Sequence, residues 1–178
     1  MIGSKKELDA YISSDKEVNG INNGLSYIIK LLYGNVNAHS FRYLKSLRKY
    51  EYYTNTGRIF RHYYRFKTRR LGLRYGFEFH INTIGKGLHL PHIGDIILNC
   101  ESMGENCHVN VGVVVGNRGA LNDLPTIGNN VDLCTGCKVL GKIKIGDNVV
   151  VAPNAVVIHD VPDNTIVGGV PATILKQR

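Results

Sequence analysis

Residues 127–157 read IGNNVDLCTGCKVLGKIKIGDNVVVAPNAVV, and every sixth position of this stretch holds an aliphatic residue. A period of six matches neither the period of a helix nor that of a strand. It is typical of a parallel β-helix, in which three short strands complete a triangular turn and each strand buries one aliphatic side chain. The aliphatic series is Ile127, Leu133, Val139, Ile145, Val151 and Val157.

The same period extends toward the N-terminus. Glycine often follows the aliphatic residue, as at Gly85, Gly128 and Gly146, because the next position turns a corner with an unusual φ. The sequence therefore predicts a mainly β fold of stacked hexapeptide coils over residues 76–170. The upstream series is Ile84, Leu90 and Ile96 and then, after one inserted residue, Met103, Val109 and Val115.

Before residue 76 the apolar residues recur at helical spacing. Short helices are expected over residues 5–12 and 23–33, and longer ones over about 40–53 and 59–71. The chain therefore divides into an N-terminal helical region, residues 1–75, and the coil domain. Residues 117–126 interrupt the repeat as a protruding loop, and residues 171–178 form a C-terminal tail.

The chain carries a formal charge of +8, and much of the positive excess lies in residues 41–75, which are also rich in tyrosine. We expect this segment to be helical, with packed aromatic rings and solvated Lys and Arg side chains. The alternative is peripheral contact with a membrane or another anionic polymer through the same residues. No specific nucleic-acid partner is expected.

The N-terminal stretch MIGSKKELDAYISSDKE lacks the apolar region of a secretion signal, and no run of 18 apolar residues is present. We therefore expect a cytoplasmic protein that is peripheral at the inner face of the membrane if the basic segment engages it. Its four cysteines are expected to be reduced. A zinc site built on Cys134 and Cys137 is the weaker alternative, because the hexad pattern already explains these positions, and no metal is required.

The repeat is interrupted at residues 88–95, LHLPHIGD, and at residues 117–126, NRGALNDLPT. Function tends to lie where a regular scaffold is interrupted. Three runs of sequence carry a resemblance to a known family, and the first of them contains residues 88–95. The runs are GFEFHINTIGKGLHLPHIGDIILN from Gly76, MGENCHVNVGVVVG from Met103, and DVPDNTIVGGVPATILK from Asp160.

With these runs, residues 40–178 resemble the hexapeptide-repeat acyltransferases, specifically the serine acetyltransferase branch. Within it they look most like O-acetyltransferases of capsular and exopolysaccharide biosynthesis. The resemblance implies a left-handed parallel β-helix, a homotrimer, and transfer of an acetyl group from acetyl-CoA to a hydroxyl group. By resemblance, His92 is the general base and Glu78, where serine acetyltransferases carry Asp, is its carboxylate partner.

The acceptor expected from this resemblance is a sugar or polysaccharide hydroxyl. Serine acetyltransferases carry an Asp at the position of Pro91, and Arg and His at the positions of Asp123 and Leu124. Without these groups the charges of serine would be buried unpaired. His89 is a further candidate for contact with the acceptor.

In the family, coenzyme A lies in the groove between adjacent β-helices of a trimer. Position by position, the resemblance places its binding residues at Gly116, Asn117, Thr135, Pro153, Gly168 and Lys176.

Several alternatives stay open. Within the same fold, the protein could be a serine O-acetyltransferase or a sugar N-acetyltransferase. A zinc carbonic anhydrase would need three histidine ligands, of which His89 and His92 supply two. The non-enzymatic alternative is a β-helix scaffold or binding module.

Overall fold

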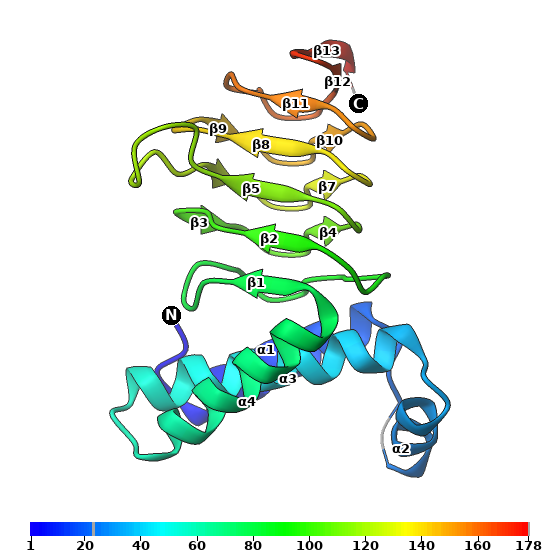
Figure 1. Ribbon diagram of the computed structural model, residues 1–178, viewed down its shortest axis with the longest axis vertical. Helices are drawn as coiled ribbons and strands as arrows, with labels where there is room; N and C mark the ends of the chain where they lie inside the picture. The colour runs from blue at the N-terminus through cyan, green and yellow to red at the C-terminus, as the bar shows by residue number, and fades with distance from the viewer. Residues whose placement is uncertain (23, 178) are drawn as a thin grey trace.

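The computed structural model describes residues 1–22 and 24–177. Figure 1 shows a column of stacked coils standing on a layer of helices. The helices are α1 (Lys5–Val18), α2 (Leu25–Leu32), α3 (Val36–Asn55) and α4 (Phe60–Tyr75). Three of them are longer than their apolar spacing predicted, and residue 23, where α2 was expected to begin, lies outside the described residues. Across the described residues, none of the helices has the length and hydropathy needed to span a membrane.

Three sheets form the sides of the column. The first sheet has the order β1-β2-β5-β8-β11, the second β13-β12-β10-β7-β4, and the third β3-β6-β9. The strands are β1 (Phe77–Phe79), β2 (Ile96–Leu98), β3 (Ser102–Met103), β4 (His108–Val109), β5 (Val114–Gly116), β6 (Thr126–Ile127), β7 (Asp132–Leu133), β8 (Lys138–Leu140), β9 (Lys144–Ile145), β10 (Val150–Val151), β11 (Val156–Val157), β12 (Thr165–Gly169) and β13 (Ala172–Gln177).

Neighbouring strands pair in parallel except at the C-terminal end, where β12 and β13 form an antiparallel pair. The segment expected as a C-terminal tail therefore contains a strand. The parallel β-helix and the N-terminal helices predicted from the sequence are confirmed, whereas the left-handed sense of the coil stays a prediction.

The hexad residues stack in columns inside the prism, as in the second sheet, where Val109, Leu133 and Val151 stand in register and are fully buried. One position differs from the pattern. Leu98, not Ile96, stands in register with Val115 of the next coil. Ile96 is also buried but pairs with Phe77 at the base of the first sheet.

Gly85, Gly128 and Gly146, for which an unusual φ was expected, are not among the residues with positive φ. They are small because a Cβ there would meet atoms of the next coil.

Asparagines turn many of the corners. Asn130, Asn148 and Asn164 have φ of 53°, 56° and 57°, a left-handed conformation that Asn tolerates better than other residues with a side chain. Their side chains also form a ladder, since Asn130 Nδ2 donates to Asn148 Oδ1 and Asn148 Nδ2 donates to Asn164 Oδ1. Asparagine therefore both accommodates the backbone conformation of these corners and links successive corners through side-chain hydrogen bonds.

The helices close the open lower end of the prism. Tyr43 of α3 packs edge-on against Phe77 and Phe79 of β1, with ring centroids 5.1 and 5.2 Å apart. The same apolar core continues without interruption from α3 and α4 into the coils. The helical layer therefore belongs to the packing of the coil domain.

The cysteines are free thiols within this packing. Cys137 is fully buried inside the column, as its hexad position predicted, and burial raises the pKa of its thiol to about 12. The thiol therefore stays protonated near neutral pH and fills space as a small apolar side chain.

Candidate active site

Glu78 and His92, the proposed dyad, stand on neighbouring parts of the prism surface. Glu78 is the exposed middle residue of β1, between the buried Phe77 and Phe79. His92 is exposed in the corner that leads from the second sheet to the first. Among the described residues no hydrogen bond or ion pair joins the two side chains, so the dyad stays a prediction.

One edge of the prism gathers several of the predicted residues. The corners after Leu90, Val109, Leu133 and Val151 all connect the second sheet to the first and therefore stack along this edge. Gly136 N donates to Val111 O and Asn154 N donates to Thr135 O, each at 2.9 Å. His92, Thr135 and Pro153 consequently lie along one edge, which we call the His92 edge.

The remaining predicted residues lie elsewhere. Gly116 ends β5 and Asn117 begins the loop of residues 117–126, which also carries Asp123 and Leu124 and leads to the third sheet. Figure 1 shows this loop protruding on the left, opposite the corners of the His92 edge. Gly168 and Lys176 lie in the terminal strand pair, β12 and β13. A single chain therefore does not bring all the predicted coenzyme A contacts together.

A column of polar side chains stands on the second sheet beside the His92 edge. The rings of His89 and His108 stack at 4.7 Å between centroids, and His108 Nδ1 lies 3.3 Å from Asp132 Oδ1. The three residues are in register, each directly before a buried hexad residue. The hexad pattern alone assigned no role to His108 or Asp132. Aligning every third hexad, however, would have placed His89, His108 and Asp132 in one column.

The protonation of this column follows from its surroundings. Burial, and secondarily the neighbouring His108, lowers the pKa of His89 below its usual value of 6.5, which favours a neutral imidazole at pH 7. When His108 Nδ1 donates to Asp132, His108 Nε2 is left as an acceptor. The column therefore contains a buried ring nitrogen, His108 Nε2, without a hydrogen-bond partner among the described residues.

Helix α1 fixes the segment that carries His89 and His92. Asp15 Oδ1 accepts hydrogen bonds from the backbone N–H groups of Gly87 and Leu88, at 2.8 and 3.0 Å. Asn19 accepts one from Leu90 N at 3.2 Å and donates one to Leu88 O at 2.9 Å. These side chains replace the strand that the lowest coil lacks beneath it, so its exposed backbone edge is satisfied.

A depression of about 740 Å³ lies where α3 and α4 meet β1 and β2. Glu78 and Asp95 supply carboxylates to its lining, whereas Arg65 and Arg69 supply guanidinium groups. Asp95 lies three residues beyond His92, in the same corner. The depression therefore carries charges of both signs, and its lining includes Glu78 and His80 but not His92.

The chain is similar in sequence to proteins of known activity. No family model matches the chain. It is 40% identical over 107 residues to a serine acetyltransferase of Staphylococcus epidermidis and 40% identical over 106 residues to one of Staphylococcus aureus. These matches cover 58% and 57% of the chain, which itself spans about half the length of either relative. A match of this length must include the middle of the chain, where Glu78 and His92 lie.

Solved structures agree over nearly the whole chain. Soybean serine acetyltransferase superposes with a TM-score of 0.79 at 26% identity, over 96% of this chain and 70% of that one. The Neisseria gonorrhoeae serine acetyltransferase in complex with serine gives 0.77 at 25% identity, over 97% and 71%.

These findings correct the expected acceptor. The expected sugar or polysaccharide hydroxyl, and with it the capsular and exopolysaccharide branch, is wrong, because the similar proteins are serine acetyltransferases, including one solved with serine. The differences at Pro91, Asp123 and Leu124 do not by themselves identify an acceptor, since other charged side chains line the depression between the helices and the first sheet. The chain thus has the hexapeptide-repeat acyltransferase fold and is similar in sequence to the serine acetyltransferases.

Proposed function

We propose that this protein is an acetyl-CoA-dependent serine O-acetyltransferase. The observation that carries the proposal is the 40% identity to serine acetyltransferases over a stretch that includes the predicted dyad. Acetyl-CoA as co-substrate is supported by the same similarity and by a fold neighbour that was solved as a serine acetyltransferase in complex with CoA.

In the proposed reaction, His92 acts as general base. One imidazole nitrogen accepts the proton of the serine hydroxyl as its oxygen attacks the thioester carbonyl, and Glu78 orients the ring. Backbone N–H groups near Gly116 stabilise the oxyanion. When the C–S bond breaks, the imidazolium returns the proton to the leaving thiolate, so that O-acetylserine and coenzyme A are released.

The depression that Glu78 lines suits a zwitterionic acceptor. Serine presents an ammonium group and a carboxylate, and both must be paired when they leave water. Asp95 is placed to pair with the ammonium group, and Arg65 or Arg69 with the carboxylate. These groups would take the place of the family residues that are absent at Pro91, Asp123 and Leu124.

We also propose that the active unit is a homotrimer of left-handed coils. The predicted coenzyme A residues Gly116 and Asn117 lie at a different corner of the prism from the His92 edge. A site that uses both corners forms only if the loop of one copy reaches the His92 edge of another. Light scattering that showed a monomer with full activity would contradict this assembly.

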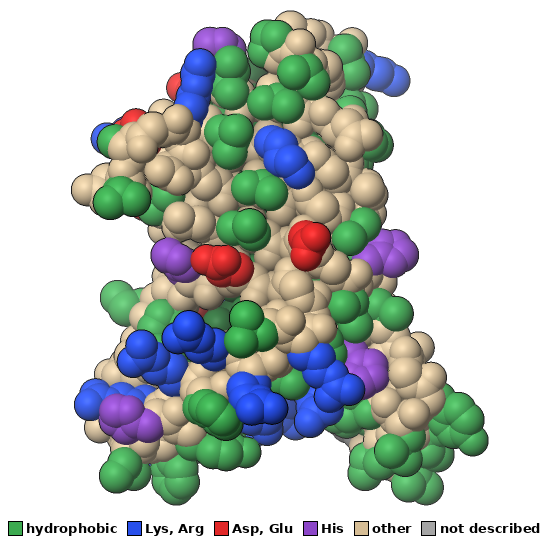
Figure 2. All heavy atoms as spheres, viewed as in Figure 1, with side chains coloured by type: hydrophobic (Ala, Val, Ile, Leu, Met, Phe, Trp, Pro, Cys, Tyr) green, Lys and Arg blue, Asp and Glu red, His purple; other side chains and the backbone are tan. Residues whose placement is uncertain are grey.

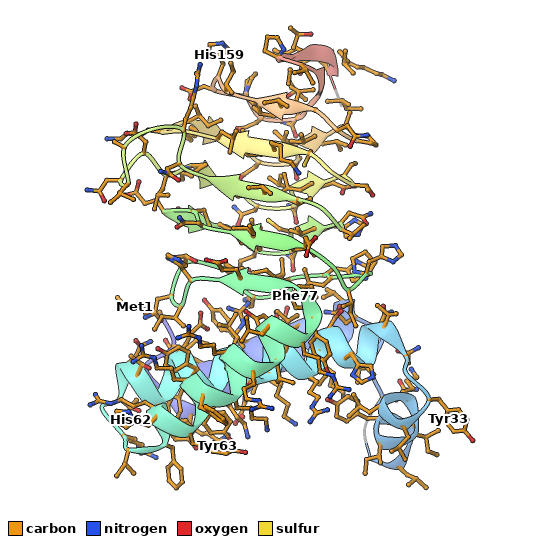
Figure 3. The ribbon with its side chains drawn as sticks, viewed as in Figure 1. Met1, Tyr33, His62, Tyr63, Phe77 and His159 are labelled. Atoms are coloured by element: carbon orange, nitrogen blue, oxygen red, sulfur yellow. The ribbon has the colours of Figure 1, made fainter. Side chains whose placement is uncertain are left out.

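The test measures release of coenzyme A from acetyl-CoA in the presence of L-serine, detected with a thiol reagent. A parallel assay with glucosamine as the acceptor tests the N-acetyltransferase alternative. We expect release that depends on serine, and a decrease of at least about 100-fold in His92→Ala with unchanged acetyl-CoA binding by calorimetry. His159→Ala, an exposed histidine at the far end of the column (Figure 3), is the matched control. Near-normal turnover of His92→Ala would refute the assignment of the base, and failure to bind acetyl-CoA would favour a scaffold.

A further inference from the structure

A basic groove lies between α2, α3 and α4, at the end of the molecule opposite the C-terminal coils. Its volume is about 510 Å³. Four cationic side chains line it: Arg42, Lys45 and Lys49 from α3, and Lys67 from α4. The three residues of α3 are spaced three and four apart and therefore share one face of the helix.

These four cations form no ion pair with a carboxylate among the described residues. Lys49 Nζ instead donates to the hydroxyl of Tyr64 at 3.2 Å, and Lys67 lies over the same ring. Burial lowers the pKa of Lys45, with Lys49 and Lys67 adding to the shift, as expected when like charges face one another without an anion.

Exposed apolar side chains surround the groove. On α2, Leu25 is 71% exposed and Leu32 is 80% exposed; before and in α4, Ile59 is 80% exposed and Phe66 is 63% exposed. Figure 2 shows apolar side chains gathered at the two lower extremities of the helical layer, with Lys and Arg between and above them. In Figure 3 Tyr33 and Tyr63 mark these two extremities. One planar surface could contact both at once.

We propose that this end of the molecule docks on an anionic lipid bilayer, with a headgroup phosphate in the basic groove and the apolar side chains of α2 and α4 in the interfacial layer. The aliphatic residues favour lipid over nucleic acid, which offers stacking surfaces and phosphates but nothing for Leu or Ile to enter. The inference does not depend on the proposed catalytic activity.

The charge of α4 argues against a second copy of the chain as the occupant. Residues 60–75 contain six Lys and Arg and no Asp or Glu. Two such faces brought together would repel each other, whereas an anionic surface attracts both. The basic residues are Arg61, Arg65, Lys67, Arg69, Arg70 and Arg74.

Vesicle flotation tests the proposal, with vesicles of phosphatidylcholine alone or mixed with phosphatidylglycerol. We expect the full chain to float only with the anionic vesicles. Lys45→Gln/Lys49→Gln should lower partitioning about 25-fold, since each basic residue at such a surface contributes roughly a factor of five. Leu25→Ser/Leu32→Ser should also weaken binding without changing the charge. Lys142→Gln/Lys144→Gln removes the same charge from the coils and should have little effect.

Circular dichroism melting first shows that each variant is folded. The proposal is overturned if wild type stays unbound, if the control pair weakens binding as much as the groove pair, or if a short single-stranded oligonucleotide binds more tightly than the vesicles. Binding of inorganic phosphate by a chain that does not bind the anionic vesicles would overturn it too, because the groove would then be a site for free phosphate. If Leu25→Ser/Leu32→Ser has a lower oligomeric mass than wild type and wild type does not bind vesicles, the apolar face instead contacts a second copy of the chain.

Discussion

At the scale of single residues, His89 and His92 lie three positions apart yet have different surroundings. His92 is exposed in a corner, whereas His89 is half-buried and stacked on His108. A general base must be neutral to accept a proton and must reach the acceptor. The exposure of His92 fits the role of base that we propose for it, and the lowered pKa of His89 favours a neutral neighbour that adds no positive charge.

The lowered pKa of His89 predicts a pH dependence of stability. Its pKa is below 6.5 in the folded protein, so the unfolded chain binds more protons as the pH falls through that value. The free energy of unfolding therefore decreases as the pH falls through 6.5 and levels off below the folded pKa. We expect His89→Gln to reduce this slope in urea unfolding measured between about pH 8 and pH 5.

His39, whose pKa burial also lowers, provides the comparison. His39→Gln should reduce the slope by its own share, and the two effects should add because the residues lie on separate elements. A His89→Gln profile parallel to that of wild type would show that the surroundings of His89 do not shift its titration.

At the scale of elements, the corners determine how the coils stack. Asn148 has φ of 56° and contributes both its amide nitrogen and its amide oxygen to the ladder with Asn164 and Asn130. Asn148→Ala should lower the free energy of unfolding by about 1–3 kcal/mol, because Ala is strained at this φ. Asn148→Gly removes the ladder but not the permitted φ, so it should cost less.

Urea unfolding of the two variants checks this order. If Gly proved as costly as Ala, the ladder rather than the backbone conformation would account for the role of Asn148. A change of Asn117→Ala, in the protruding loop and at ordinary φ, is the control and should leave stability close to that of wild type.

The six-residue period was sufficient to predict the coils and their buried columns, since each coil repeats the same local geometry. It assigned Ile96 instead of Leu98 to the column of Val115, because the corner before β2 is two residues longer than the hexad spacing, whereas Met103 follows Leu98 after only five positions. The period could not predict how Asp15 and Asn19 support the segment of His89 and His92. Those contacts join residues about seventy positions apart, and no local pattern records them.

The site was predicted in the same uneven way. The resemblance placed the candidate base in a segment that the structure holds firmly, and the structure leaves the predicted dyad untested. The resemblance also led to the wrong acceptor. The charged residues of the family are missing at the positions of Pro91, Asp123 and Leu124, and this was taken to mean that no side chain could pair with the charges of serine. Arg65 and Arg69 of α4 line the depression, and the packing of α4 beside β1 cannot be seen in the repeat.

At the scale of the whole molecule, one buried charge cluster joins the helical layer to the coils. Arg48 of α3 is fully buried and pairs with Asp15 of α1 at 2.9 Å and with Glu51 at 3.3 Å. It also donates to the backbone oxygens of Ile84 and Gly85 in the lowest coil. Glu51 in turn accepts from Asn82 N at 2.8 Å. The guanidinium group of Arg48 therefore links α1 and α3 to the lowest coil.

Arg48→Met should lower the free energy of unfolding by about 3–5 kcal/mol, because it leaves Asp15 and Glu51 buried without a counter-charge. Adding Asp15→Asn and Glu51→Gln removes those charges and should recover part of the loss, since neutral amides keep much of the hydrogen bonding. Arg42→Met, at a partly exposed position of α3, controls for the substitution. Urea unfolding, with hydrogen exchange of residues 84–90, measures the result. Equal stability of Arg48→Met and Arg42→Met, or unchanged exchange in the lowest coil, would show that apolar packing alone holds the helices beneath the column.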